Sequence, residues 1–133
     1  MRRTVGGAWA VARGAALAGI VALVLAGCED YRSRDAVRLT GGNPQKGREL
    51  IGRYGCDACH TIPGVPGARG RVGPPLAGVA SRMYIAGVLQ NTPPNLERWI
   101  KDPPGIDSAT AMPNLRVTDA DARDIAAYLY TLR

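Results

Sequence analysis

The sequence predicts an all-α fold in which short helices are joined by loops rich in proline and glycine. Helix-start signals occur three times, each an Asn or Thr directly before a stretch of helically spaced apolar residues. The run at 61–78 is so dense in glycine and proline that regular structure is not expected there. No segment shows strong period-two alternation, so strands are not predicted.

The first 27 residues have the features of an export signal. Three arginines precede the apolar run Ala15–Ala26, which carries no charge. The run is shorter than the roughly 20 apolar residues of a membrane span and suits a signal peptide. Leu25-Ala26-Gly27 before Cys28 resembles the lipobox of bacterial lipoproteins, which implies a signal peptide at 1–27 and a lipid on Cys28. An uncleaved N-terminal anchor with an incidental cysteine is the alternative. Both place the chain in the bacterial cell envelope, on the periplasmic side of a membrane.

Residues 28–42 are expected to be the lipidated Cys28 followed by a flexible tether, because they are polar and end in Gly41-Gly42. The whole chain has a formal charge of +6. Without residues 1–27, which hold three arginines and no acid, 14 basic and 11 acidic residues remain, a charge of +3. The basic residues are scattered, so nucleic-acid binding is not expected.

One domain is expected over 43–133. Its first helix begins at Asn43-Pro44, since Asn is a good N-cap and Pro suits the first helical position. A second begins at Thr92 and must end by Asp102, because two prolines follow. The last begins at Thr118, with an acidic first turn that suits the helix dipole. The segments between them are expected to be loops at 61–78 and 103–117, with an ambiguous apolar stretch at 79–89.

The motif Cys56-Asp57-Ala58-Cys59-His60 contains the chain's only histidine and is typical of a c-type haem attachment site. The two thiols add across the two vinyl groups of a haem, and the adjacent imidazole then reaches the iron. A redox Cys-x-x-Cys pair would need a βαβ setting, and a closed zinc site would need four ligands. The motif therefore predicts one covalent haem c, around which the short helices and loops wrap.

Met112 is the candidate for the second axial ligand of the iron, opposite His60. It lies in a loop and is stiffened by the proline that follows, whereas Met83 is expected to pack in the protein. A thioether favours ferrous iron and raises the reduction potential relative to two imidazoles. The Pro74 carbonyl is the candidate acceptor for the second ring nitrogen of His60, because no helix uses it. A purely stiffening role for Pro74 is the alternative.

With these motifs in the family's order, residues 43–133 closely resemble class I c-type cytochromes. The resemblance rests on Cys56–His60, Gly73-Pro74-Pro75-Leu76, Met112-Pro113 and the C-terminal Ala127-Tyr128-Leu129. It implies that the N- and C-terminal helices cross beside the haem, with Gly47 at the crossing and Tyr128 against it.

The run from Ser81 to Pro103 is similar to the cytochrome domain fused to subunit II of some bacterial haem-copper oxidases. That similarity implies that Arg82 and Trp99 bind haem propionates. A surface arginine and a core tryptophan are the alternatives.

The expected function is an electron carrier, not an enzyme. Its donor would be a quinol-oxidising complex or a dehydrogenase, and its acceptor a haem-copper oxidase in a respiratory chain. One alternative is a permanent cytochrome subunit of an oxidase or periplasmic dehydrogenase. Another is a five-coordinate haem sensor or peroxidase, which requires an open iron position.

Overall fold

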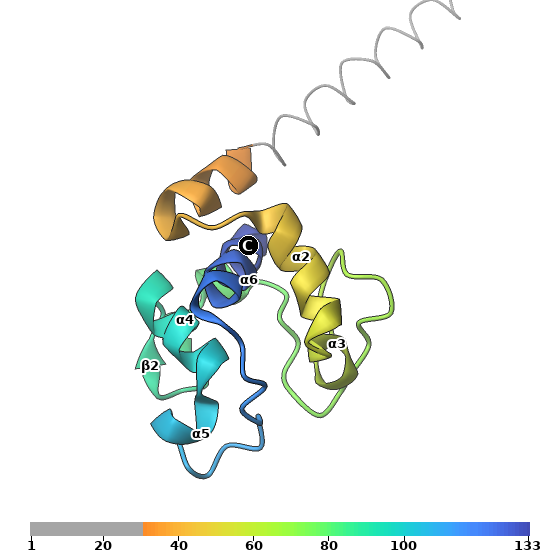
Figure 1. Cartoon of the computed structure of the whole chain (residues 1–133), viewed down its shortest axis with the longest axis vertical. Coiled ribbons are helices and arrows are strands. Elements are labelled where there is room, and N and C mark those ends of the chain that lie inside the picture. Colours follow the sequence, from red (N-terminus) through yellow and green to blue (C-terminus); the bar gives the residue numbers. More distant parts are fainter. Residues whose placement is uncertain (1–30) are drawn as a thin grey trace, which may run out of the picture. The chain divides into compact units, whose positions relative to one another are not determined.

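The computed structural model describes residues 31–133, and the unit from Arg32 to Arg133 is compact (Figure 1). The proposed signal peptide and Cys28 lie outside the described residues. Within the described part, no helix is both long and apolar enough to cross a membrane. After a helical stretch at 31–40, the elements are α2 (Pro44–Arg53), α3 (Cys56–Cys59), the 3-10 turn η1 (Val79–Ser81), β1 (Tyr84–Ile85), β2 (Leu89–Gln90), α4 (Pro93–Lys101), α5 (Pro103–Ile106) and α6 (Asp119–Thr131).

The three predicted helix starts are present, and each has a side-chain cap. The Asn43 side chain accepts from the backbone N–H of Lys46 at 3.0 Å, which satisfies one free donor of the first turn of α2. Thr92 and Thr118 do the same for α4 and α6, at 3.4 and 3.2 Å. The predicted all-α class is confirmed, because the signals that begin these helices are local in sequence.

Helices α2 and α6 cross at a glycine, as the family resemblance implied. A Cβ added at Gly47 would lie 1.9 Å from the carbonyl oxygen of Asp124, so only glycine permits this approach. Lys46 strengthens the crossing through an ion pair with Asp124 at 2.8 Å. Tyr54, just after α2, donates to Asp121 at 2.8 Å. The crossing thus fixes the direction in which α2 delivers α3.

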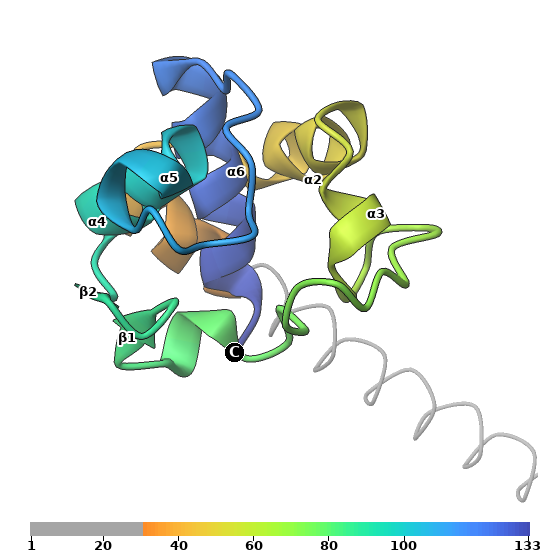
Figure 2. The same cartoon turned by 90° about the horizontal axis from the view of Figure 1, so that it is seen from below.

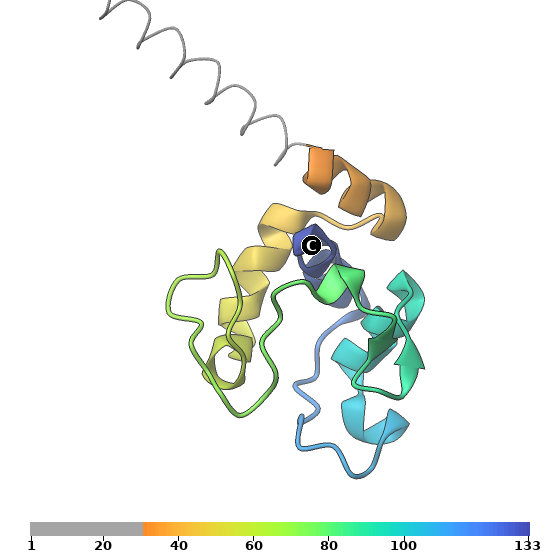
Figure 3. The same cartoon turned by 180° about the vertical axis from the view of Figure 1, so that it is seen from behind.

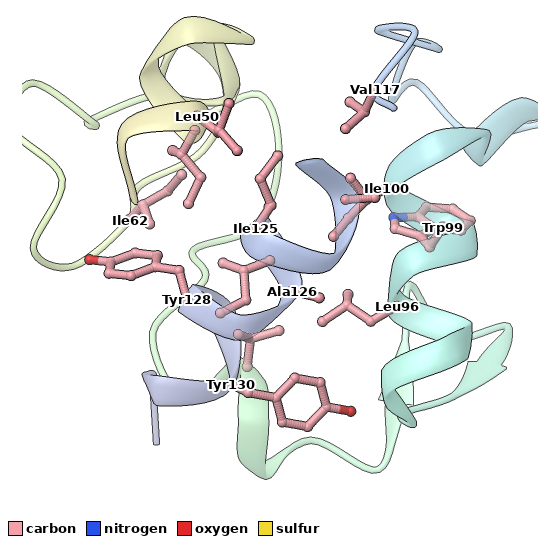
Figure 4. Packing of buried hydrophobic residues seen from close by; sticks show 14 of the residues in the cluster. Leu50, Ile62, Leu96, Trp99, Ile100, Val117, Ile125, Ala126, Tyr128 and Tyr130 are labelled. Atoms are coloured by element: carbon pink, nitrogen blue, oxygen red, sulfur yellow. The ribbon is translucent and has the colours of Figure 1, made fainter. Parts of the chain in front are cut away.

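The hydrophobic core lies around α6, which contacts both α2 and α4 (Figure 4). Leu50 and Ile51 are almost fully buried on α2, while Leu96, Trp99 and Ile100 form the buried face of α4. Small residues on α6, above all Ala122 and Ala126, allow its neighbours to come close. The loop 61–78 adds two side chains to this core, Ile62 and Ala68, and its remaining residues are mostly more exposed.

Residues 31–40 differ from the flexible tether expected from sequence, because they are helical and pack against the domain. Ala36 is fully buried in the hydrophobic core, and the neighbouring Asp35 side chain is also largely buried. The Asp35 carboxylate pairs with Arg38 at 2.6 Å and with Arg133 at the end of the chain. The helix lies beside the C-terminal end of α6 (Figure 1). Contacts between opposite ends of the domain therefore order a segment whose local sequence is polar.

Two smaller elements were also not predicted. The ambiguous stretch at 79–89 folds into η1 and an antiparallel hairpin in which Ile85 pairs with Leu89. The prolines at 103–104, interpreted from sequence only as a helix stop, also begin α5, whose N-cap Asp102 accepts from Gly105 at 3.3 Å. Proline is suited to the first turn of a helix because that turn's N–H groups are free.

Candidate functional site

The two cysteines of the motif lie on one short turn of helix. Gly55 has φ of +72°, a left-handed conformation that favours glycine, and it separates α2 from α3. Residues three apart in a helix lie on the same side, so α3 brings Cys56 and Cys59 to one face. His60 follows in extended conformation, with its N–H bonded to the Cys56 carbonyl at 3.0 Å.

The cysteine pair does not have the chemistry of a redox centre. No disulfide joins the two cysteines, and burial raises the pKa of an unreacted Cys56 thiol to about 11. Redox-active pairs instead lower the pKa of one cysteine to form a reactive thiolate. Within residues 31–133 no group of three or more His, Cys, Asp or Glu side chains could hold a metal ion, whereas a closed zinc site needs four ligands. The redox and zinc interpretations of the motif therefore have no structural support.

The loop 61–78 closes over the motif through two glycines. A Cβ added at Gly73 would lie 2.3 to 2.8 Å from three atoms of the His60 ring, so the backbone of Gly73 packs directly on the imidazole. A Cβ added at Gly70 would lie 2.4 Å from the Ala58 carbonyl oxygen. The Gly73 N–H also donates to the Cys59 carbonyl at 2.8 Å. These contacts form a backbone cradle for the histidine.

His60 makes the hydrogen bond that the sequence analysis expected. Its Nδ1 lies 2.7 Å from the Pro74 carbonyl oxygen. A carbonyl only accepts, so Nδ1 carries the proton and Nε2 keeps its lone pair in the neutral ring. An imidazole held in this way by its other nitrogen has the arrangement of a metal ligand.

The two candidate methionines differ sharply in exposure. Met83 is 78% exposed, so it does not pack in the core as expected. Met112 is half-buried and packs against the hydrophobic core, with its N–H bonded to Thr110 Oγ1 at 3.2 Å. The segment 107–117 that carries Met112 runs between α3 and α5 in all three views (Figures 1, 2 and 3).

Trp99 and Arg82 lie in different surroundings. Trp99 is 7% exposed on the buried face of α4, as a core tryptophan would be. Arg82 is exposed, and its guanidinium donates to the carbonyls of Pro75 and, at 3.2 Å, Ala77. Neither these two acceptors nor the glycine cradle around His60 follows from the sequence pattern, because each contact joins residues that the tertiary fold brings together.

Comparison with known proteins decides the family. The model of the family described as Cytochrome c matches residues 44–133, which is more than half of the chain. The chain belongs to the cytochrome c family. The predicted recognition as a monohaem class I c-type cytochrome is thereby confirmed, as are its fold class and its covalent haem c at Cys56 and Cys59.

This cytochrome is also similar to "Cytochrome c oxidase subunit 2" of Alkalihalophilus pseudofirmus. The two are 33% identical over 89 residues, which is 66% of this chain and 25% of that protein. The chain therefore spans about a quarter of the length of that relative. No solved structure matches the present chain.

The residues present fit a haem c. Cys56 and Cys59 share one face of α3, so both can bond to one edge of the macrocycle. The backbone cradle at Gly73 and the bond to Pro74 orient His60 with Nε2 free to bind iron. The cytochrome is an electron-transfer protein, and bound haem iron supplies its one-electron ferric/ferrous couple.

Proposed function

We propose that this cytochrome is a lipid-anchored periplasmic electron carrier whose iron is held by His60 and Met112. The hydrogen bond from His60 Nδ1 to the Pro74 carbonyl carries the proposal, because it leaves Nε2 as a ligand of fixed direction. The contrast between half-buried Met112 and exposed Met83 supports the choice of the second ligand. With His60 and Met112 both bound, the iron would transfer electrons and would have no position open to a substrate.

Each residue has a defined part in the proposed mechanism. Cys56 and Cys59 would tether the haem covalently and so prevent its loss. His60, oriented by Pro74, and Met112, held on the loop before α6, would hold the iron, and the bound haem would supply the one-electron couple. Trp99 is proposed to bind a haem propionate through its indole N–H.

The ligand assignment is tested by the visible spectra of the ferric and ferrous protein with and without carbon monoxide. The wild type is expected to be low-spin in both states and to show the ferric methionine–iron band. Carbon monoxide should not change the spectrum of its reduced form. Met112→Ala should become high-spin when reduced and bind carbon monoxide. Met83→Ala is the matched control, since that side chain is 78% exposed, and it should behave as wild type. A wild type that binds carbon monoxide readily would instead indicate a haem sensor or peroxidase.

Membrane attachment is proposed through a lipid on Cys28, after removal of residues 1–27. Cys28 is three positions before Tyr31, the first residue that the structure describes. Such an anchor would hold the domain close to the periplasmic surface of a membrane, since stable attachment by several acyl chains does not require a spanning helix. Cys28→Ser should release the cytochrome from the membrane fraction into the periplasmic fraction, with an unchanged haem spectrum. Retention in the membrane fraction would favour an uncleaved N-terminal anchor.

The partner is proposed to be a respiratory complex, with a quinol-oxidising complex or a dehydrogenase as donor and a haem-copper oxidase as acceptor. The similarity to an oxidase subunit supports this choice of acceptor. The same similarity favours a second candidate, a permanent subunit of an oxidase. Purification after mild detergent extraction distinguishes them, because a carrier separates from the oxidase activity and a subunit remains with it in fixed ratio.

A further inference from the structure

Arg82 is connected to the proposed iron ligand through the backbone of the loop that follows the motif. The segment 73–76 is fastened at its ends by two backbone bonds, from Gly73 N–H to the Cys59 carbonyl at 2.8 Å and from Leu76 N–H to the Thr61 carbonyl at 2.9 Å. Between these ends stand two prolines, which have no N–H to donate. The middle of the segment can therefore be held only through its carbonyls.

Those carbonyls have two different partners. The carbonyl of Pro74 accepts from His60 Nδ1 at 2.7 Å, and the next carbonyl, that of Pro75, accepts from Arg82. The same guanidinium nitrogen of Arg82 also donates to Ala77 at 3.2 Å. One planar cation thus joins two carbonyls that follow the Pro74 carbonyl in the sequence.

The backbone of Arg82 is itself held from α6. The Asn91 side-chain amide donates to the carbonyl of Arg82 at 2.9 Å and to that of Val79 at 2.8 Å. The amide oxygen of Asn91 accepts from the Tyr130 hydroxyl at 3.1 Å. A continuous set of hydrogen bonds therefore runs from α6 to the loop beside His60.

We propose that Arg82 is a positioning residue for the iron ligand: its guanidinium clamps the carbonyls of Pro75 and Ala77 and so holds the Pro74 carbonyl against His60. The similarity to the oxidase cytochrome domain implies a different role for Arg82, the binding of a haem propionate. The two roles differ in mechanism, since a propionate partner acts through its charge and a clamp through its geometry. The inference rests on His60 as an iron ligand, which belongs to the proposed function.

The two roles predict opposite shifts in reduction potential. A firm bond from Nδ1 to a carbonyl makes the imidazole a stronger donor and favours ferric iron. If the clamp is lost, that bond weakens and the potential rises. If Arg82 acts as a cation beside a propionate, its removal takes away positive charge and the potential falls. Lysine keeps the charge but presents a compact ammonium in place of the planar fork.

The test compares Arg82→Lys and Arg82→Gln in the haem-loaded protein. Potentiometry gives the reduction potential, and NMR gives the rate at which the His60 Nδ1 proton exchanges with deuterium. The clamp predicts faster exchange and a higher potential in both variants. Unchanged exchange with a lower potential in Arg82→Gln and a wild-type potential in Arg82→Lys would overturn it, as would no change in either variant.

Two controls keep these outcomes interpretable. Arg98→Lys changes another exposed arginine, whose contact is one bond of 3.5 Å to Asn95, and it should leave both readouts unchanged. Tyr130→Phe removes only the hydroxyl that fixes Asn91, so it should shift both readouts in the same direction by a smaller amount. The low-spin spectrum of the wild type separately reports whether iron is six-coordinate. Failure of the ligand assignment is therefore distinguishable from failure of the clamp.

Discussion

Replacement of Gly73 by alanine places a methyl group directly on the imidazole of His60. The new Cβ would lie 2.3 Å from Cε1, 2.6 Å from Nδ1 and 2.8 Å from Nε2 of the ring. Ordinary contact requires a displacement of ~1 Å, of either the ring or the loop. The ring is tethered through its covalent neighbour Cys59, so we expect the loop to lift.

The expected destabilisation follows from two losses. Overpacking of a close contact typically costs about 1–3 kcal/mol. The bond from the Gly73 N–H to the Cys59 carbonyl, 2.8 Å long, would also weaken, at about 0.5–1.5 kcal/mol. Together they amount to about 1.5–4.5 kcal/mol, or a fall in Tm of at least about 6 °C for a domain of this size. Because the lifted loop includes Pro74, the hydrogen bond to Nδ1 should lengthen as well.

The assay is thermal unfolding followed by far-ultraviolet circular dichroism, together with the visible spectrum of the reduced protein. Gly52→Ala is the matched control, since a Cβ there meets nothing within 4 Å and alanine is the better helix former. It should melt at or above the wild-type temperature. If Gly73→Ala melts with the wild type and keeps its spectrum, the steric argument for the cradle is refuted.

Two further predictions concern the packing of the helices. Gly47→Ala should destabilise the fold by about 3 kcal/mol or more. Its Cβ would lie 1.9 Å from a backbone carbonyl oxygen of α6, which cannot move without separating the two helices. Chemical denaturation measures the loss of stability, and a denaturation midpoint equal to that of the wild type would contradict the prediction. The hydrogen bond from Arg38, together with Arg133, lowers the pKa of Asp35 in the folded protein. The ionised carboxylate therefore stabilises the fold at any pH above its unfolded pKa, which is near 3.8. This stability is lost as the pH falls through the lower pKa of the folded state. Hydrogen exchange should therefore show residues 31–40 opening in acid, with Asp35→Asn opening them already at neutral pH; protection that is independent of pH in the wild type would contradict this.

The elements that were predicted correctly depend on neighbours in sequence. Each helix cap joins residues three apart, such as Thr118 and Asp121, and the haem motif spans five consecutive positions. The hydrogen bond between His60 and the Pro74 carbonyl could also be predicted from sequence, because few other donors are available to a proline carbonyl in a loop. Local chemistry restricts such features to one or two outcomes before the chain folds.

The helix at 31–40 could not be predicted in the same way. Its sequence is polar, and nothing in it indicates that Ala36 is buried or that Asp35 meets Arg133, which is 98 positions away. Arg82 presents a similar difficulty, since a guanidinium pairs equally well with a propionate or with two carbonyls. In both cases the partner is chosen by the tertiary fold.

The contacts around His60 are the place where partners selected by the tertiary fold have most effect on the proposed iron ligand. The ring touches the Gly73 backbone and bonds to the Pro74 carbonyl, while Arg82, at the end of η1, reaches the same loop. None of these contacts requires a side-chain donor beside the imidazole, so the ligand is positioned almost entirely by backbone. Substitutions that move this backbone should therefore perturb the iron more than substitutions of exposed residues that make no contact with it. Gly73→Ala acts on the ring directly and Arg82→Lys through two peptide units, so the first should have the larger effect on the spectrum.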